Sequence, residues 1–478
     1  MAFGPRAPCP LRRHAQARPD ALALWAPSRR WTYAELDAAV AATGARLREH
    51  GYAGGTRVAL RLPRGPAFVV LLWALWREGA VATPISTRLP AAEVRRAAKR
   101  LRVRGLITRD PDVLADGGTE AESPESLVVR NASGRSVATG RPIHRRATIL
   151  FTSGSTGRPT AVLHSWANHL YSAKGANANV PLRAGDRWLL SLPLYHVGGL
   201  AILVRCALAG AAVAVPDQDA SVSGALARTG ATHLSLVATQ LRRLLEARDG
   251  QAPEWVRAVL VGGGPIPEGL LRRGHARSWP LHTSYGSTEM ASQVTTTPPG
   301  GALADLQTAG RRLPHRRVRI AEDGHVLVAG VPLCIGRLEE GTLRDPRVDG
   351  WYPTGDVGRF DAQGRLHVEG RIDRQFVSGG ENIQPEEIEA ALEQLEAVER
   401  AAVVAVPDAE YGRRPVGFIQ AQGPLRPETW RRVLSGSLPR FKLPDAFYEM
   451  PERAVEGQLK VNYEVLRQWA REERKNRR

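Results

Sequence analysis

Residues 151–160 read Phe-Thr-Ser-Gly-Ser-Thr-Gly-Arg-Pro-Thr, and apolar sequence lies on both sides of them. Six consecutive small or hydroxylic residues, from Thr152 to Gly157, offer closely spaced backbone N–H and side-chain O–H donors with little bulk. A loop of this composition can wrap phosphate oxygens. It does not follow the GxxxxGK[ST] pattern of a Walker A loop, because no lysine follows Gly157. Taken alone, such a run is also typical of an exposed turn.

Outward from this loop, short apolar strands alternate with helices, as in layered α/β proteins. The predicted strands lie at residues 148–151, 188–192, 211–215, 233–237, 256–261 and 281–284. After Gly324 short strands dominate (325–328 and 366–369), followed by a helix at 385–395 and a strand at 401–406. We therefore predict an α/β fold with two domains. Residues 1–371 form a large multi-layer N-terminal domain with mostly parallel sheets, and residues 372–478 form a small mobile α+β C-terminal domain.

The first 150 residues carry weaker signals. Residues 33–49 show helical spacing of apolar residues, and residues 57–62 are predicted to form a short alternating strand. Residues 110–146 are polar and rich in Gly, Ser and Glu, which predicts a linker or a surface excursion.

Composition excludes several classes of protein. The chain has 478 residues, 43% hydrophobic and 24% charged, which is globular and rules out disorder, collagen and coiled coil. The best apolar run, residues 67–76, is too short for a membrane span of about 20 residues, and no secretory signal is visible. Three distant cysteines, Cys9, Cys206 and Cys334, argue against a disulfide framework or a zinc site and for the reducing cytoplasm.

The net charge of +18 and the pI of about 10.7 suggest a nucleic-acid partner at first sight. Only five lysines are present, however, so 61 of the 66 basic residues are arginine. This bias is typical of genome-wide codon composition, and aromatic residues are not interleaved with the arginines in a stacking pattern. We expect no nucleic-acid partner, and each lysine becomes more informative.

Four further motifs follow the Ser/Gly/Thr loop along the chain. They are a glycine turn after a strand (Gly262, Gly263 and Gly264), Ser284-Tyr-Gly-Ser-Thr-Glu289, an aspartate after glycine (Asp356), and Gly370-Arg-Ile-Asp373 followed by Ser378-Gly-Gly-Glu-Asn-Ile-Gln-Pro-Glu386. Glycines at the carboxyl end of a strand let a flat ligand approach the backbone. A carboxylate beside hydroxyl groups suits Mg²⁺. Each motif by itself is also compatible with an ordinary turn.

In this order the motifs resemble the adenylate-forming superfamily of acyl-CoA synthetases, luciferases and peptide-synthetase adenylation domains. The resemblance runs from about Pro10 to the end of the chain. Residues 189–196, 232–240 and 378–387 are similar, more narrowly, to the o-succinylbenzoate–CoA ligases of menaquinone biosynthesis. This resemblance implies ATP-dependent ligation of o-succinylbenzoate to CoA through an acyl-adenylate, with release of AMP and pyrophosphate. It also implies ATP, Mg²⁺ and CoA as cofactors or co-substrates.

The resemblance also implies roles for individual residues. ATP would be bound by Thr152, Ser153, Gly154, Ser155, Thr156, Gly157, Gly262, Gly263, Gly264, Tyr285, Gly286, Thr288, Asp356 and Arg371. Within this set Tyr285 would cover the adenine, and Asp356 with Arg371 would hold the ribose. Thr288 and Glu289 would serve the phosphate and the metal. Lys460 and Glu289 would be catalytic, and the domains would hinge at Asp373.

The acyl substrate is expected to contact His196, Arg205, Thr239 and Gln240. By the same resemblance, His196 would be catalytic and gate the approach of the thiol, although a lone histidine near apolar sequence is often a core residue. Arg205 interrupts an apolar run, and burying an arginine is costly unless an anion or water reaches it. An anionic partner and snorkelling to solvent both remain open.

Two positions depart from the family pattern. Thr160 stands where relatives usually carry lysine, so one phosphate-neutralising charge is missing and Arg158 is the nearest replacement. Gln458 and Leu459 separate Gly457 from Lys460, so Lys442 competes for the role of catalytic lysine but lacks the surrounding motif.

Other functions remain as alternatives. They are a CoA ligase for another aromatic or medium-chain acid, and a non-catalytic nucleotide-binding relative suggested by Thr160. The predicted partners are a small carboxylic acid, ATP and CoA, and assembly into a homo-oligomer is left open.

Overall fold

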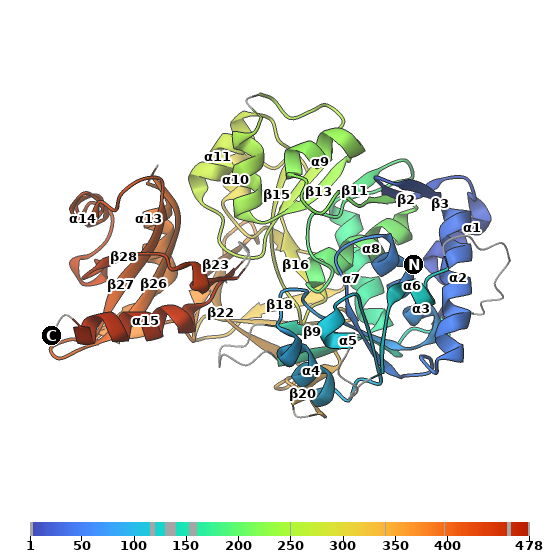
Figure 1. The fold of residues 1–478 in the computed structure, drawn as a ribbon. Helices are drawn as coiled ribbons and strands as arrows, with labels where there is room; N and C mark the ends of the chain where they lie inside the picture. The colour runs from blue at the N-terminus through green and yellow to red at the C-terminus, as the bar shows by residue number, and fades with distance from the viewer. Residues whose placement is uncertain are drawn as a thin grey trace.

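The structure is a computed structural model that describes residues 3–114, 120–129, 140–152, 160–248, 250–339, 341–395, 397–456 and 460–476. Two large mixed sheets with their helices form one body, and a smaller body follows β22 (Tyr352–Phe360) and β23 (Leu366–Arg371) (Figure 1). The α/β class predicted from the sequence is confirmed.

Among the described residues, the first large sheet has eight strands. Their order is β21 (Thr342–Arg344), β20 (Gly336–Glu339), β10 (Thr160–Ser165), β9 (Arg146–Thr152), β5 (Val81–Pro84), β4 (Arg57–Arg61), β6 (Gly105–Thr108) and β7 (Glu120–Glu122). The strands from β9 to β7 pair in parallel, and β10, β20 and β21 are antiparallel.

The second large sheet has nine described strands. Their order is β17 (Arg311–Arg312), β16 (Ser292–Thr296), β15 (Leu281–Ser287), β14 (Ala258–Val261), β13 (His233–Leu236), β11 (Arg187–Leu189), β12 (Ala212–Ala214), β2 (Leu22–Ala26) and β3 (Arg29–Thr32). The central strands from β15 to β2 are parallel, which places the residues after β14 at one edge of the sheet.

Helices cover and separate these sheets. They are α1 (Pro10–Ala17), α2 (Tyr33–Glu49), α3 (Pro66–Glu78), α4 (Ala91–Arg100), α5 (Pro111–Leu114), α6 (Pro124–Leu127), α7 (Trp166–Asn179), α8 (Val197–Ala209), α9 (Val222–Thr229), α10 (Ala238–Glu246), α11 (Glu268–Ala276) and α12 (Leu303–Leu306). Near the N-terminus, β1 (Arg6–Ala7) and β8 (Arg141–Pro142) form a short antiparallel pair. β18 (Arg316–Ile320) and β19 (His325–Gly330) join β22 and β23 in an antiparallel sheet.

The smaller body has its own core of α13 (Pro385–Glu393), α14 (Pro427–Ser435) and α15 (Tyr463–Asn476) around β26 (Val398–Asp408), β27 (Gly412–Ala421) and β28 (Phe447–Glu449). Its short strands are β24 (Phe376–Ser378), β25 (Glu381–Ile383), β29 (Val455–Glu456) and β30 (Lys460–Val461), with 3₁₀ turns at Arg440–Lys442 and Glu452–Ala454. The sequence predicts a domain boundary between Arg371 and Ile372, and β23 ends at Arg371.

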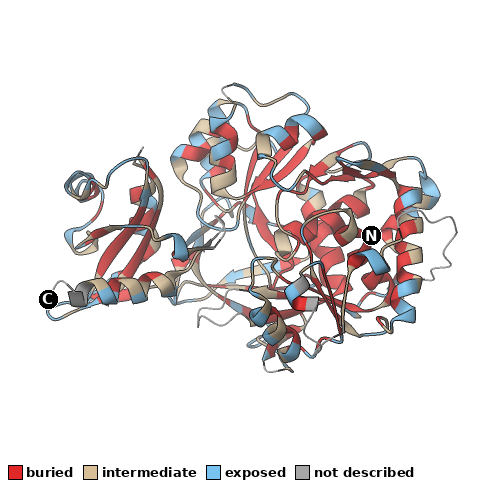
Figure 2. Ribbon diagram, viewed as in Figure 1, coloured by how far each residue is buried: buried red, intermediate tan, exposed pale blue. Residues whose placement is uncertain are grey.

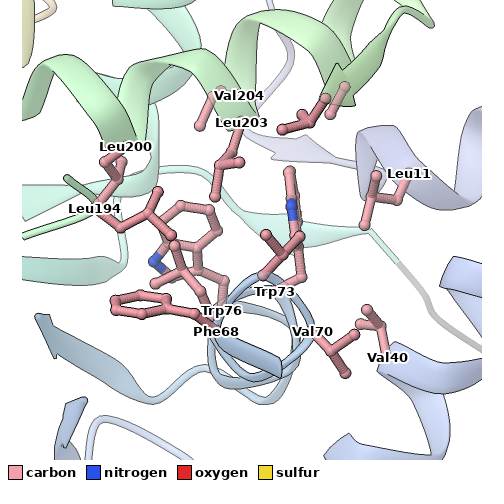
Figure 3. Close-up of a cluster of buried hydrophobic side chains, with 14 of the residues drawn as sticks. Leu11, Val40, Phe68, Val70, Trp73, Trp76, Leu194, Leu200, Leu203 and Val204 are labelled. Carbon is pink, nitrogen blue, oxygen red and sulfur yellow. The ribbon is translucent and has the colours of Figure 1, made fainter. Parts of the chain in front are cut away.

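The main core surrounds α3. Pro66 opens this helix after Gly65, and Gly79 ends it in the left-handed region with φ of +80°. Every residue from Phe68 to Glu78 is buried, and the buried residues of both large sheets gather around it (Figure 2). Figure 3 shows Phe68 and Trp76 toward Leu194 and Leu200, with Val70 on another side facing Val40. The apolar run that is too short to cross a membrane is therefore a central core helix, and among the described residues no helix is long and apolar enough to span a bilayer.

The structure confirms several local predictions and corrects two. Residues 33–49 form α2, which begins at a capping box of Thr32 and Glu35. The strand predicted at 57–62 is β4, but Val58, Ala59 and Leu60 are all buried because parallel neighbours and helices cover both its faces. The segment 110–146 is not only a linker, since β7 extends the eight-stranded sheet and β8 pairs with β1.

Candidate active site

The phosphate loop predicted from the sequence connects two antiparallel strands. β9 ends at Thr152 and β10 begins at Thr160, and these two residues pair across the strands. The Thr152 hydroxyl donates to the Thr160 carbonyl at 3.4 Å. The predicted phosphate contacts Ser153, Gly154, Ser155, Thr156 and Gly157, and the substitute charge Arg158, lie outside the described residues.

The glycine turn after β14 lies beside the next parallel strand. A Cβ on Gly262 would stand 2.8 Å from the Ser284 Oγ, and Gly263 has φ of +92°. Side chains at these two positions would collide or strain the backbone. A Cβ on Gly264, by contrast, would meet nothing within 4 Å. The turn therefore leaves space beside the ends of β14 and β15 at Gly264.

Tyr285 of β15 reaches the aspartate predicted to hold ribose. The Tyr285 hydroxyl donates to Asp356 Oδ2 at 2.5 Å. Burial and the neighbouring Asp356 charge raise the pKa of Tyr285 well above its ordinary value, so this hydroxyl stays protonated. Burial also raises the pKa of Asp356, against the hydrogen bond from Tyr285 and the charge of Arg371.

Arg371 connects the aspartate of this site to the predicted hinge residue. It pairs with Asp356 across β22 and β23, with Nη1 3.4 Å from Asp356 Oδ1. Its Nη2 lies 2.9 Å from Asp373 Oδ2, and its Nε donates to Asp373 Oδ1 at 3.1 Å. The hydrogen bonds that Arg371 donates to Asp373, together with the charges of Asp356 and Asp373, raise the pKa of Arg371 despite its burial. Tyr285, Asp356, Arg371 and Asp373 therefore form one continuous chain of contacts.

Glu289 is buried and held by residues that sequence reasoning missed. Arg337 Nη2 lies 2.9 Å from Glu289 Oε1, and the Tyr352 hydroxyl donates to the same oxygen at 3.0 Å. Burial favours a higher pKa for Glu289, but the hydrogen bond and charge of Arg337 keep its pKa below the ordinary value. Arg337 lies on β20, in the other large sheet, and no local motif marks it in the sequence.

Thr288, Glu289 and Gly286 belong to the hairpin of β15 and β16. Gly286 is obligatory because a Cβ there would collide with the Ser292 carbonyl of the partner strand. The residues that the structure describes contain no group of three or more His, Cys, Asp or Glu able to hold a metal ion.

Arg205 is buried in α8. Its side chain is 1% exposed, Nη2 donates to Ser292 Oγ at 3.1 Å, and the guanidinium lies 5.2 Å from the ring centre of Trp188. Its Nε is buried without a hydrogen-bond partner among the described residues. Burial lowers the pKa of Arg205 to about 10, so the group remains charged at neutral pH. Snorkelling to solvent, the alternative left open by the sequence, is wrong.

The remaining acyl-site predictions lie at the ends of helices. His196 caps α8, half-buried, with its ring 4.7 Å from that of Tyr195. Thr239 and Gln240 lie in the first turn of α10, where Gln240 accepts from the Val237 N–H and donates to the Ser191 carbonyl at 3.1 Å. The Gln240 amide is therefore hydrogen-bonded to neighbouring backbone groups. A contact of Thr239 or Gln240 with the substrate stays a prediction.

The two lysines that compete for the catalytic role differ in setting. Lys442 Nζ lies 2.5 Å from Glu387 Oε2, so this lysine already has a carboxylate partner. Lys460 begins β30, and its backbone lies opposite that of Glu456 in the antiparallel pairing of β30 with β29. It lies near the end of the small domain, just before α15.

Two family models match the sequence of this chain. One, described as AMP-binding enzyme, matches residues 11–338, and the other, described as AMP-binding enzyme C-terminal domain, matches residues 387–455.

Curated relatives match most of the length of the chain. The 2-succinylbenzoate–CoA ligase of Bacillus licheniformis is 33% identical over 453 residues, which cover 92% of this chain and 95% of that protein. The protein of the same name from Salmonella typhimurium is 34% identical over 428 residues, with coverage of 89% and 90%.

Solved structures share the fold. The o-succinylbenzoate CoA synthetase of Bacillus subtilis in complex with the acyl-adenylate intermediate OSB-AMP aligns with a TM-score of 0.88 and 28% identity, over 96% of this chain and 98% of that one. The same enzyme in complex with ATP and magnesium ion also gives a TM-score of 0.88. A variant of Escherichia coli MenE with bound OSB-AMS gives a TM-score of 0.85 at 30% identity, with coverage of 98% and 99%.

Proposed function

This chain belongs to the AMP-binding enzyme family, and we propose that it joins 2-succinylbenzoate to CoA through an acyl-adenylate. It is an AMP-forming acid–thiol ligase that consumes ATP and releases pyrophosphate and AMP. Activation is needed because a carboxylate is a poor electrophile, whereas its mixed anhydride with AMP carries a good leaving group that a thiol can displace. Such a reaction supplies the CoA thioester used in menaquinone biosynthesis.

The observation that carries the choice of acid is the buried Arg205. 2-Succinylbenzoate has two carboxylates, of which one is activated and the other stays anionic on the ring. A desolvated carboxylate needs a cation, and guanidinium offers a planar two-donor match. Arg205 has no carboxylate partner among the described residues, and its buried Nε is an unused donor. We assign it to the ring carboxylate, with His196 at the reacting end of the acyl group.

The nucleotide is assigned to residues at or after the ends of β9 and β14 and to residues of β15, β22 and β23. The loop after Thr152 would hold the phosphates, Tyr285 and the Gly262–Gly264 turn the adenine, and Asp356 with Arg371 the ribose. Asp356 accepts bonds from both Tyr285 and Arg371 in the structure, so ribose hydroxyls would have to share or replace these donors. This exchange conserves the number of hydrogen bonds on a buried carboxylate and so avoids a desolvation penalty.

The donor set around Thr288 and Glu289 fits Mg²⁺, which prefers one or two protein oxygens and several phosphate or water oxygens. Glu289 is kept ionised by Arg337, as a ligand of a hard cation must be. When bound, the metal ion neutralises phosphate charge during transfer of the adenylyl group. Lys460 would supply the remaining positive charge between the substrate carboxylate and the α-phosphate.

The two half-reactions need different surroundings for the same acyl group. We infer that the small domain turns at Asp373 between them, withdrawing Lys460 and admitting the CoA thiol. ATP and CoA are cytoplasmic metabolites, so we place the reaction in the cytoplasm.

The proposed function is tested with purified protein, ATP, Mg²⁺, CoA and 2-succinylbenzoate. We expect equimolar AMP, pyrophosphate and one thioester, measured by chromatography and mass spectrometry. A panel of benzoates and medium-chain fatty acids serves as the comparison. If a panel member has a much higher kcat/KM than 2-succinylbenzoate, the acid is misassigned, and if no acid releases pyrophosphate the chain is a non-catalytic relative.

A further inference from the structure

The turn that carries Thr288 and Glu289 has a strained backbone. It connects β15 to β16, and the residues that follow Met290 are Ala291, with φ of +51°, and Ser292, with φ of +120°. Neither residue is glycine, and residues that carry a side chain rarely adopt a positive φ. Strained backbone persists only where surrounding contacts hold it, and it is common at functional sites.

Groups from distant parts of the chain hold this turn. Ser172 of α7 donates to the Ala291 carbonyl at 2.7 Å. The backbone N–H of Cys334 donates to the Glu289 carbonyl, also at 2.7 Å. Within the turn, the Ala291 N–H donates to the Thr288 carbonyl at 3.0 Å.

The Thr288 carbonyl has a second partner, the imidazole of His164. The Nε2 of His164 lies 2.8 Å from this oxygen, and the side chain is fully buried. A carbonyl oxygen only accepts, so Nε2 carries the proton and Nδ1 is left as an acceptor. That Nδ1 is buried without a partner among the described residues. Among the described residues, the bond to the turn is therefore the one hydrogen bond that the ring makes.

His164 also has an informative position along the chain. It lies near the end of β10, the strand that follows the predicted phosphate loop and belongs to the eight-stranded sheet. The turn of Thr288 belongs to the nine-stranded sheet. The hydrogen bond thus connects β10, the strand that follows the proposed phosphate loop, to the backbone of Thr288, which is a second proposed phosphate contact.

We propose that His164 is a positioning residue for adenylate formation, whose Nε2–H fixes the Thr288 carbonyl and thereby the directions of the Thr288 hydroxyl and the Glu289 carboxylate toward Mg²⁺·ATP. This inference rests on the proposed function only for the roles of Thr288 and Glu289. It does not depend on which acid is the substrate.

His169 is a matched control. Its ring lies 5.1 Å from that of His164 and is 2% exposed, in the same aromatic cluster with Trp76 and Trp166. Its Nε2 lies 3.0 Å from Thr148 Oγ1, on β9 rather than on the turn. Loss of either histidine removes a buried imidazole, but only loss of His164 removes a hydrogen bond from the Thr288 carbonyl.

The test compares His164→Leu, His164→Gln and His169→Leu with the wild type. Binding of Mg²⁺·ATP without acid is measured by calorimetry, adenylate formation by pyrophosphate exchange, and stability by thermal unfolding. Loss of a group that orients a metal ligand typically weakens affinity or activity about 10- to 100-fold, and we expect this for His164→Leu. His164→Gln should recover most of the loss, because its amide can donate to the same carbonyl.

His169→Leu should bind Mg²⁺·ATP like the wild type. The unfolding temperature of His164→Leu should fall no more than that of His169→Leu, since the change also removes the unpaired Nδ1. The proposal is overturned if His164→Leu binds and adenylates normally, if both leucine variants lose equally, or if glutamine does not recover the loss. Failure of the proposed function would appear separately, as absence of acid-dependent turnover in the wild type.

Discussion

At the scale of single residues, we propose that the charge of Arg205 selects the acid that the protein accepts. The buried guanidinium contacts Ser292 and the Trp188 ring, and no described carboxylate neutralises its charge. Truncating one partner of a buried charge pair costs about 2–5 kcal/mol, or roughly 30- to several-thousand-fold in kcat/KM.

Arg205→Leu should lose about that factor of roughly 30 to several thousand with 2-succinylbenzoate. It should lose far less with the analogue that lacks the ring carboxylate, because no anion is then left unpaired. Steady-state kinetics with both acids makes the comparison, and Arg205→Lys tests whether the planar fork matters beyond charge. Equal losses with the two acids would mean that Arg205 supports structure and does not read the substrate.

Lys460 is expected to act in only one half-reaction. Lys460→Ala should greatly reduce adenylate formation while thioester formation from supplied acyl-adenylate stays near the wild-type rate, because the charge is needed only while the phosphoryl bond breaks. Rapid quench of each half-reaction measures this. Lys442→Ala is the control, since Lys442 is paired with Glu387. A comparable loss in both steps would argue for misfolding or for another lysine.

At the scale of elements, strand β20 determines the ionisation of a residue on the β15–β16 hairpin. Arg337 is one-third exposed and donates to the buried Glu289. With this contact the folded-state pKa of Glu289 lies below its ordinary value of 4.5. Its contribution to stability is thus present above that pH and is lost as pH falls through the lower folded-state pKa.

Arg337→Met should reverse this pH dependence. We expect burial then to outweigh the remaining hydrogen bond from Tyr352 and to raise the folded-state pKa of Glu289 above 4.5. The variant should therefore lose stability relative to the wild type as pH rises from there toward neutrality. The loss near pH 7 should be about 1–3 kcal/mol, the cost of an uncompensated buried group. Urea unfolding at about pH 5 and about pH 8 measures it. Arg344→Met changes an exposed residue on neighbouring β21 and should leave the free energy of unfolding unchanged at both pH values. If the stability lost in Arg337→Met does not depend on pH, Arg337 does not act through the ionisation of Glu289.

At the scale of the whole molecule, two arginines bracket the proposed hinge. Arg371 is held on the large domain by Asp356 and by the Thr354 carbonyl at 3.0 Å. Arg374 is held on the small domain by Glu389 at 2.5 Å and lies 3.7 Å from the ring centre of Tyr463. Ile372 and Asp373 lie between these two arginines, and we propose that the small domain turns there.

Asp373→Pro should restrict this rotation, because proline fixes its own φ and limits the residue before it. We expect overall turnover to fall while one half-reaction, measured alone, keeps its rate. The half-reaction that survives identifies the favoured orientation. Asp373→Ala controls for loss of the bond to Arg371, and equal inhibition of both half-reactions by proline would place the pivot elsewhere.

Much of the fold could be predicted from the sequence because its causes are local. The capping box of Thr32 and Glu35, the apolar spacing of residues 33–49 and the glycine turn after β14 act over a few residues through sterics and backbone hydrogen bonds. The order of the motifs was likewise sufficient to indicate the family and the adenylate chemistry.

Only the tertiary structure decided which groups meet. His164 touches Thr288 from 124 residues away, Tyr285 reaches Asp356 across 71, and Arg337 reaches Glu289 across 48. The sequence left Arg205 undecided between burial and solvent, and the packing of α8 against β16 decided it. The physical reason is that local propensity acts within a few residues. Burial of charge and pairing of polar groups depend instead on which distant strands and helices pack together.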